Sequence, residues 1–181
     1  MKQVYLIRHG LPDFPDGRRM CLGTTDIPMG PAGLRQAEEM AKRLPPVTAV
    51  FSSPLTRAVQ TAEAIGLPVT VLPGLRELYA GAWDGLTFDQ IRERYPRLYE
   101  ARGRDQSLLL PGAEDPQGGL ARFEAALKTA AELASGDAAV VAHGGVMELL
   151  LEKITGVRRK PGYAEIVPLI VENGCFILQE E

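Results

Sequence analysis

The sequence contains little cysteine, which limits how its fold can be stabilised. Its 181 residues include only Cys21 and Cys175, which are too few for a disulfide framework. A single disulfide between these two cysteines is the alternative. A domain of this length buries roughly 70% of the surface that its unfolded chain exposes, so a hydrophobic core can stabilise it without disulfides or metal. Two cysteines also suit a reducing compartment. We therefore expect a cytoplasmic protein with a single domain, residues 1–181.

Long apolar runs and an excess of positive charge are also absent. No apolar stretch approaches the roughly 18 residues that a membrane span needs, and a strand-like pattern directly follows Met1 and Lys2, without the features of a signal peptide. The net charge of −3 and the pI near 5.5 argue against a nucleic-acid partner, which usually requires a basic face. We expect neither a membrane nor a nucleic acid as partner. The sequence leaves undecided whether the protein forms a homo-oligomer.

Histidine is equally rare, and both histidines stand in the same context. His9 ends the sequence VYLIRH and His143 ends VVAH, and a glycine follows each of them. Each apolar run reads as a buried strand, and ligands of open α/β sheets bind at the carboxyl ends of such strands. The alternative is two ordinary loop histidines. The repeated context, with Arg8 beside the first histidine, favours a shared ligand site.

The periodicity of apolar residues predicts an alternation of strands and helices. Continuous apolar strands such as AAVVA indicate a sheet covered on both faces, and Asn173-Gly174 is typical of a hairpin turn. We therefore predict a three-layer α/β/α fold with a mostly parallel central sheet and an antiparallel edge hairpin. The expected strands are 2–7, 48–51, 68–72, 138–142, 165–171 and 175–178; the expected helices are 31–44, 54–65, 88–95, 116–135 and 146–154; residues 11–29, 74–86 and 103–114 are expected to be loops.

A second group of residues favours an anionic ligand. Ser53 and Pro54 have the form of a helix start, where free N–H groups and a partial positive charge suit an anion. Arg57 follows within about one turn. Together with Arg8 it could clamp a phosphate, because guanidinium groups match phosphate oxygens in bidentate fashion. The alternative for Arg57 is a solvated charge on the helix surface.

Four segments carry a resemblance to a known family. IRHG (7–10), SSPLTRAVQTA (52–62), LRELYAGAWDG (75–85) and VAHGGV (141–146) are similar to the signature blocks of the histidine phosphatase superfamily, the phosphoglycerate-mutase-like group, in its shorter phosphatase branch. They occur in the order of that family and span about four-fifths of the chain. The resemblance implies a single histidine phosphatase domain with a phosphoglycerate-mutase-like fold.

The resemblance also implies roles for individual residues. His9 would be the nucleophile that forms a covalent phosphohistidine, and Glu77 would be the general acid and base. Arg8, Arg57 and His143 would surround the phosphoryl oxygens, and His143, if cationic, would add a third positive donor. The alternative for Glu77 is an exposed carboxylate at a strand end. The expected substrate-binding residues are Gly10, Gly23, Thr24 and Gly144.

The sequence departs from the family pattern after RHG. Leu11-Pro12 replaces the usual Glu-Thr or similar pair, and Phe14-Pro15 stands where an asparagine is often found. One or two secondary phosphate contacts are therefore missing or supplied elsewhere, and Gly23 and Thr24 could offer donors from the same loop. The segment PGAED (111–115) is only partly similar to the family's Pro-Gly-Gly-Glu-Ser element.

These residues predict a metal-independent phosphoric monoester hydrolase that acts on small phosphorylated metabolites. An α-ribazole-phosphate phosphatase is the most specific version of this hypothesis. The alternatives are a phosphoglycerate mutase, which returns the phosphoryl group to a substrate, and a non-catalytic phosphate-binding regulatory domain. We expect no cofactor and no metal, because no pair of histidines and carboxylates has the close helical spacing of a zinc motif.

Overall fold

A single sheet organises the protein. The computed structural model describes residues 2–172 and 174–179, and within these residues six strands pair in the order β3-β2-β4-β1-β5-β6. The first four run parallel, whereas β5 pairs antiparallel with β1 and with β6. This confirms the predicted mostly parallel sheet with an edge hairpin; Asn173 of the predicted turn lies outside the described residues. The strands are β1 (Lys2–Arg8), β2 (Ala49–Ser52), β3 (Val69–Val71), β4 (Ala138–Ala142), β5 (Ile166–Glu172) and β6 (Cys175–Leu178).

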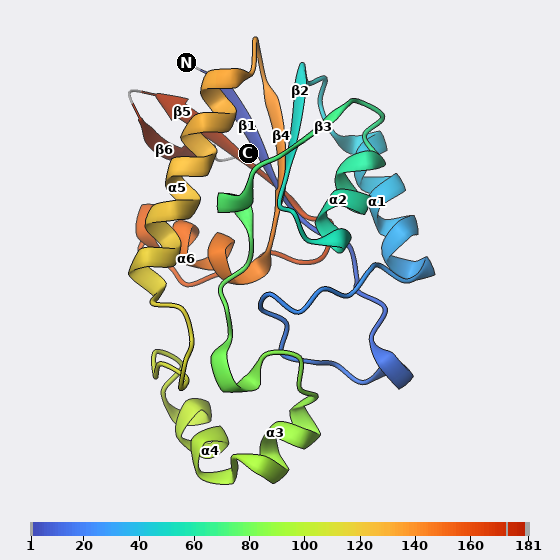
Figure 1. Ribbon diagram of the computed structural model, residues 1–181. Helices are drawn as coiled ribbons and strands as arrows, with labels where there is room; N and C mark the ends of the chain where they lie inside the picture. The colour runs from blue at the N-terminus through green and yellow to red at the C-terminus, as the bar shows by residue number, and fades with distance from the viewer. Residues whose placement is uncertain (1, 173, 180–181) are drawn as a thin grey trace.

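Helices cover both faces of the sheet. Figure 1 shows α5 and α6 on one side of the strands and α1 and α2 on the other, which confirms the three-layer α/β/α architecture. Helices α3 and α4 lie beyond the end of the sheet at which β1 and β4 finish. The helices found in the described residues are α1 (Pro31–Arg43), α2 (Thr56–Glu63), α3 (Phe88–Arg94), α4 (Pro96–Arg104), α5 (Pro116–Leu133) and α6 (Gly144–Thr155).

Strand β4 is the centre of the hydrophobic core, because every one of its residues is buried. Ala138, Val140 and Ala142 belong to the cluster that packs against α5 and α6. Ala139 and Val141 belong to the cluster on the face covered by α1 and α2. A central parallel strand between two helical layers requires this run of apolar residues, and the burial fixes the position at which the strand ends, directly before His143.

A small separate core supports the region beyond the sheet. Trp83, Ile91 and Leu110 are buried together, with side chains of α3 and α4 packed around them. Helix α3 begins with a capping box formed by Thr87 and Gln90. Helix α4 was not predicted, and none of its residues is fully buried. The two helices and their core form a cap over the carboxyl end of the parallel strands (Figure 1).

The first turn of α1 packs through a glycine, and α6 begins earlier than predicted. In α1, Leu34 is 42% exposed. Gly33 takes the buried position, where a Cβ atom would lie only 2.1 Å from the Leu11 carbonyl oxygen. Helix α6 begins at Gly144 and not at Val146, so its amino end directly follows His143.

Helix α2 begins at Thr56, two residues later than predicted, and Ser53 does not cap it. The Asp26 carboxylate accepts hydrogen bonds from the Thr56 amide, at 2.8 Å, and from the Thr56 hydroxyl, at 2.7 Å. The amino end of α2 therefore binds an anion of the protein itself. This corrects the expectation that the start of this helix is available for a phosphate.

Candidate active site

His9 follows β1 and is held in one orientation. Its side chain is only 5% exposed, and its amide donates to the Ala142 carbonyl oxygen of β4 at 3.1 Å. The ring atom Nδ1 lies 2.7 Å from the Gly10 carbonyl oxygen. Because a carbonyl oxygen only accepts, the ring proton lies on Nδ1 and the lone pair on Nε2. The Arg57 Nε–H points at this lone pair from 3.4 Å.

The environment of His9 keeps the imidazole neutral. Burial lowers its pKa from 6.5 to about 3, the charge of Arg57 acts in the same direction, and the hydrogen bond to Gly10 opposes both. At neutral pH the Nε2 lone pair is therefore available without prior loss of a proton. A neutral imidazole with a fixed tautomer is the form in which histidine acts as a nucleophile.

Arg57 is fully buried and is held by the backbone of one loop. Its Nη1 donates to the Thr25 carbonyl oxygen at 2.9 Å, and its Nη2 donates to the Gly23 carbonyl oxygen at 3.0 Å. The same loop is fixed from behind by Asp84. The carboxylate of Asp84 accepts from the amides of Gly23, Thr24 and Thr25 and from the Thr24 hydroxyl. Asp84 thus positions the carbonyl groups that orient Arg57.

His143 lies beside His9, with their ring centroids 5.0 Å apart. Its Nε2 is 2.7 Å from the Ser53 hydroxyl, which already accepts from the Leu55 amide at 3.2 Å. Ser53 can therefore donate its own proton to Nε2, which places the ring proton of His143 on Nδ1. This Nδ1 is buried, and it has no hydrogen-bond partner among the described residues.

His143 does not supply a positive charge in this state. Burial, followed by the effects of His9 and Arg57, lowers its pKa well below 6.5. His143 was predicted to add a third positive donor only if it is cationic, and in the free protein the lowered pKa favours the neutral ring. The ring still offers an N–H donor at Nδ1 if Ser53 fixes the tautomer as described.

Arg8 completes the basic group at the end of β1. Its guanidinium carbon lies 3.9 Å from the centroid of the Tyr163 ring, and its Nη1 donates to the Pro161 carbonyl oxygen at 2.6 Å. Its Nε is buried and has no hydrogen-bond partner in the described part of the chain. A side chain at Gly144 would lie 3.0 Å from this Nε. Arg8 and His143 thus each present an unused donor at the ends of adjacent strands.

Glu77 is buried at the amino end of α6. Its Oε2 accepts from the Gly145 amide at 2.7 Å, and its Oε1 accepts from the amides of Val146, at 3.0 Å, and Leu78, at 2.9 Å. A side chain at Gly145 would approach Oε1 to 2.7 Å, so only glycine allows this contact. Glu77 is 8% exposed. The structure therefore does not leave it as an exposed strand-end carboxylate.

These side chains come from distant parts of the sequence and converge at one end of the sheet, as the resemblance implied. A model of the histidine phosphatase superfamily (branch 1) matches residues 4–171. The chain belongs to the histidine phosphatase superfamily. An "Uncharacterized phosphatase PhoE" of Bacillus subtilis is 31% identical over 97% of this chain and 86% of its own length. A "Probable phosphoglycerate mutase GpmB" of Yersinia pestis is 33% identical over 91% of this chain and 79% of its own.

A solved structure supports the fold in the same way. The α-ribazole phosphatase from Shigella flexneri superposes with a TM-score of 0.81, covering 98% of this chain and 94% of that one. The two sequences are 23% identical, so this likeness concerns the fold alone. The chain thus has the phosphoglycerate-mutase-like fold that the sequence predicted.

The four expected substrate-binding residues have partners within the protein. The Gly10 amide donates to the Thr61 hydroxyl at 3.0 Å, and a Cβ atom on Gly10 would lie 2.5 Å from Met29 Sδ. Gly23 and Thr24 belong to the loop that holds Arg57, and Gly144 packs against Arg8. Their contact with a substrate stays a prediction, and the structure supports a role in positioning the arginines.

Three positioning residues of this site were not predicted. Asp84, Ser53 and Tyr163 each contact a candidate catalytic side chain or the loop that holds it. Ser53 was interpreted only as a helix cap. Asp84 stands in the quoted block AGAWDG, and an acidic residue between a tryptophan and a glycine was the available signal for it.

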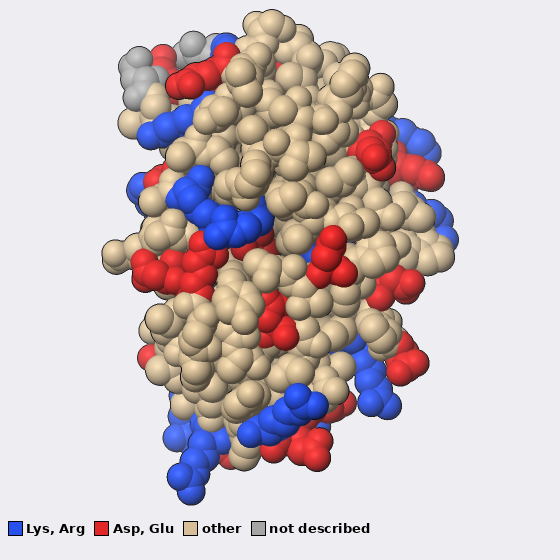
Figure 2. Space-filling view, viewed as in Figure 1, with Lys and Arg blue, Asp and Glu red and all other residues tan. Residues whose placement is uncertain are grey.

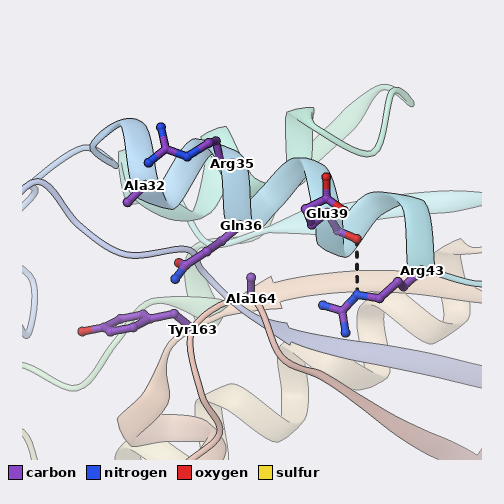
Figure 3. Close-up of a pocket in the computed structure, with 7 residues that line it drawn as sticks. All are labelled: Ala32, Arg35, Gln36, Glu39, Arg43, Tyr163 and Ala164. Carbon is purple, nitrogen blue, oxygen red and sulfur yellow. Dashed lines mark hydrogen bonds between the residues drawn. The ribbon is translucent and has the colours of Figure 1, made fainter.

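Two hollows border this region, and only one reaches Glu77. A cavity of about 680 Å³ is lined by Glu77, Gly145 and residues of the cap. Figure 3 shows the other, of about 380 Å³, between the surface of α1 and residues 163–164. There Arg43 Nε donates to the Glu39 carbonyl oxygen at 3.3 Å. Neither hollow is lined by Arg8, His9, Arg57 or His143, whereas Glu77 lines the larger one.

The two buried histidines predict acid sensitivity. The pKa of His9 is about 3 in the folded protein and near 6.5 in the unfolded chain, so between these values the unfolded chain binds more protons. The free energy of unfolding should therefore fall as the pH is lowered from 6.5 towards 3, by up to about 1.4 kcal/mol per pH unit for each histidine. Urea unfolding at a series of pH values would measure this slope. The variant His143→Gln should have a shallower slope than the wild type, and equal slopes would contradict the prediction.

Proposed function

We propose that this protein is a phosphatase that hydrolyses small-molecule phosphomonoesters through a phosphohistidine on His9. The observation that carries the proposal is the fixed tautomer of His9. Its Nδ1 proton is held by the Gly10 carbonyl oxygen, and its Nε2 lone pair faces Arg57. The Nε2 atom has only this long contact of 3.4 Å with the Arg57 Nε–H, and neither Arg8 nor Arg57 forms an ion pair among the described residues. Buried charges without a carboxylate partner favour an anionic ligand. The superfamily of this chain and its phosphatase relative support the same class of reaction.

The proposed reaction has two displacements at phosphorus. His9 Nε2 forms a bond to phosphorus while the bond from phosphorus to the leaving oxygen breaks, and Glu77 gives its proton to that oxygen. Glu77 then takes a proton from water, whose oxygen attacks phosphorus and breaks the N–P bond. Phosphate leaves, and His9 and Glu77 return to their initial forms. Arg8, Arg57 and the Nδ1–H of His143 hold the three equatorial oxygens.

The finer alternatives differ in the acceptor and in the leaving group. A phosphoglycerate mutase would transfer the phosphoryl group from His9 to a second substrate and not to water, and the Yersinia relative favours testing this. An α-ribazole-phosphate substrate is supported only by the shared fold. A non-catalytic phosphate-binding domain would bind phosphate without forming the N–P bond.

Rapid quench with a radiolabelled phosphomonoester tests the proposal. We expect acid-labile, base-stable label on the protein that appears afterwards as free phosphate. Label that moves to phosphoglycerate would support the mutase, and absence of both label and turnover would support the binding domain. We also propose a metal-independent reaction, so EDTA should leave the rate unchanged. Strong inhibition by EDTA would contradict that part of the proposal.

A further inference from the structure

The cavity next to Glu77 has an apolar wall that is open to solvent. Among the large hydrophobic side chains with high exposure, three line this cavity: Tyr79 at 44%, Phe88 at 43% and Leu109 at 51%. Trp83 and Tyr99 line the same cavity, with their ring centroids 6.1 Å apart. A cavity of about 680 Å³ that has an apolar wall and is lined by Glu77 is typical of a small-molecule pocket.

The tryptophan of this wall has an unused donor. Trp83 is 5% exposed, and its Nε1 is buried without a hydrogen-bond partner in the part of the chain that the structure describes. A buried indole N–H usually has an acceptor. A ligand in the cavity could supply one, since Trp83 is among the residues that line it.

Part of the cavity lining carries positive charge, and it includes Arg102 of the cap helix α4. Arg102, Arg158 and Lys160 line it together. Glu148 pairs with both Arg158, at 3.0 Å, and Lys160, at 3.3 Å. No ion pair of Arg102 is found within residues 2–172 and 174–179. Burial lowers the pKa of Arg102, and the nearby charge of Arg158 lowers it further. Glu148 therefore pairs with two of the three cations, whereas Arg102 donates to the Leu108 carbonyl oxygen.

Three other carboxylates line the cavity, and none of them pairs with Arg102. Glu77 is held by backbone amides, and Glu114 pairs with Arg122 at 2.7 Å and with Arg76 at 3.2 Å. Glu152 is exposed. Figure 2 shows basic and acidic side chains interspersed over the visible face, without one extended basic patch. The charge of Arg102, which has no ion pair among the described residues, is therefore a local feature, and it suits a small anionic group better than a large polyanion.

The cationic side lies close to the phosphoryl site. A Cβ atom on Gly144 would lie 3.0 Å from Arg8 Nε and 3.3 Å from Lys160 Cδ, so the stem of Lys160 and Arg8 flank the same glycine. A substrate held by Arg8 and Arg57 at its phosphoryl end can therefore extend past Glu77 along the apolar wall. Arg102 and Arg158 line the same cavity and can receive an anionic group of such a substrate.

We infer that this phosphatase takes phosphomonoesters whose leaving group has an apolar, preferably aromatic, body followed by a second anionic group. The inference rests on the proposed function and adds the substrate class to it. The apolar body packs on Phe88 and Leu109, and the second anion binds Arg102 and Arg158. A charge-assisted hydrogen bond to such a group contributes about 1.5–3 kcal/mol, which corresponds to about 10- to 100-fold in kcat/KM.

A matched pair of substrates tests the anionic group. We expect para-carboxymethylphenyl phosphate to have a kcat/KM at least about 10-fold above that of para-carbamoylmethylphenyl phosphate, whose leaving group is similar but uncharged. The variant Arg102→Gln should reduce this ratio towards one, and Arg158→Gln provides the same measurement should the first variant unfold. The matched control is Arg104→Gln, an exposed position on the same helix, which should keep the ratio of the wild type.

Competitive inhibition tests the apolar body. Phenylacetate should inhibit hydrolysis of the carboxymethylphenyl ester, whereas acetate at the same concentration should not, and equal inhibition would overturn the apolar half of the inference. Equal kcat/KM for the two esters in the wild type would overturn the anionic half and leave the proposed function intact. If neither ester is hydrolysed and His9 is not labelled, the proposed function fails as well.

Discussion

The variant His9→Gln should lose about 10⁴- to 10⁶-fold in kcat for every phosphomonoester, the range found when the nucleophile of a covalent mechanism is removed. Glutamine is similar in size to histidine and uncharged at neutral pH, so it preserves the neutral state that burial imposes on His9. It offers no nitrogen lone pair that can form a stable bond to phosphorus. Steady-state kinetics and the quench experiment should therefore both fail to detect turnover through a phosphoenzyme.

The controls for this variant separate chemistry from folding. Substrate binding should persist, because Arg8 and Arg57 are unchanged, and inorganic phosphate should still raise the melting temperature of the variant. Thermal unfolding without phosphate shows whether the core near β1 is intact. Activity of His9→Gln within about tenfold of the wild type would exclude a covalent intermediate on this residue, because the mechanism has no other route of that efficiency.

The convergence of the two histidines could be predicted from the sequence. Two apolar runs that read as buried parallel strands must end at the same edge of a sheet, and β1 and β4 are neighbours, with Arg8 paired with Ala142. Because His9 and His143 each follow directly, their side chains meet. The signature blocks then placed Arg57 and Glu77 in the same region, where the structure also brings them.

The parts that were missed depend on contacts between distant residues. Ser53 has the sequence context of a helix cap, but its hydroxyl bonds to His143, 90 positions away. Asp26 caps α2 in its place, across 30 positions. Asp84 holds the loop at residues 23–25 through backbone amides, and no sequence pattern reports which amides point inward. Such tertiary contacts override local propensity.

Helix α4 was missed for a different physical reason. It packs its partly buried Leu98 and Tyr99 on the small core of the cap, and none of its residues is fully buried. A helix that rests on a small satellite core has a short apolar stripe, so its periodicity is weak. The same property leaves side chains of the cap available to line the cavity beside Glu77.

The second large effect is expected for Glu77→Gln, and its size should depend on the leaving group. With a simple alkyl phosphate the leaving oxygen needs a proton, and loss of the general acid should cost about 10²- to 10⁴-fold in kcat. With para-nitrophenyl phosphate the leaving group departs as an anion, so transfer to His9 should be nearly unaffected. The attack of water on phosphohistidine still lacks its base. Labelled phosphoenzyme should therefore accumulate with this substrate, and a burst of nitrophenol should precede slow turnover.

This pattern distinguishes proton transfer from a structural role of Glu77. Its carboxylate accepts hydrogen bonds from the amides of Gly145 and Val146. In the glutamine variant the side-chain NH₂ group would face one of these backbone N–H donors, so one hydrogen bond at the start of α6 would be lost. Damage of that kind would lower the melting temperature and slow both substrates alike, without a burst and without accumulated phosphoenzyme. The variant Glu132→Gln, at an exposed site on α5, serves as the control for an ordinary loss of charge. Only transfer of a proton at the leaving oxygen makes the effect of the substitution depend on how acidic the leaving group is.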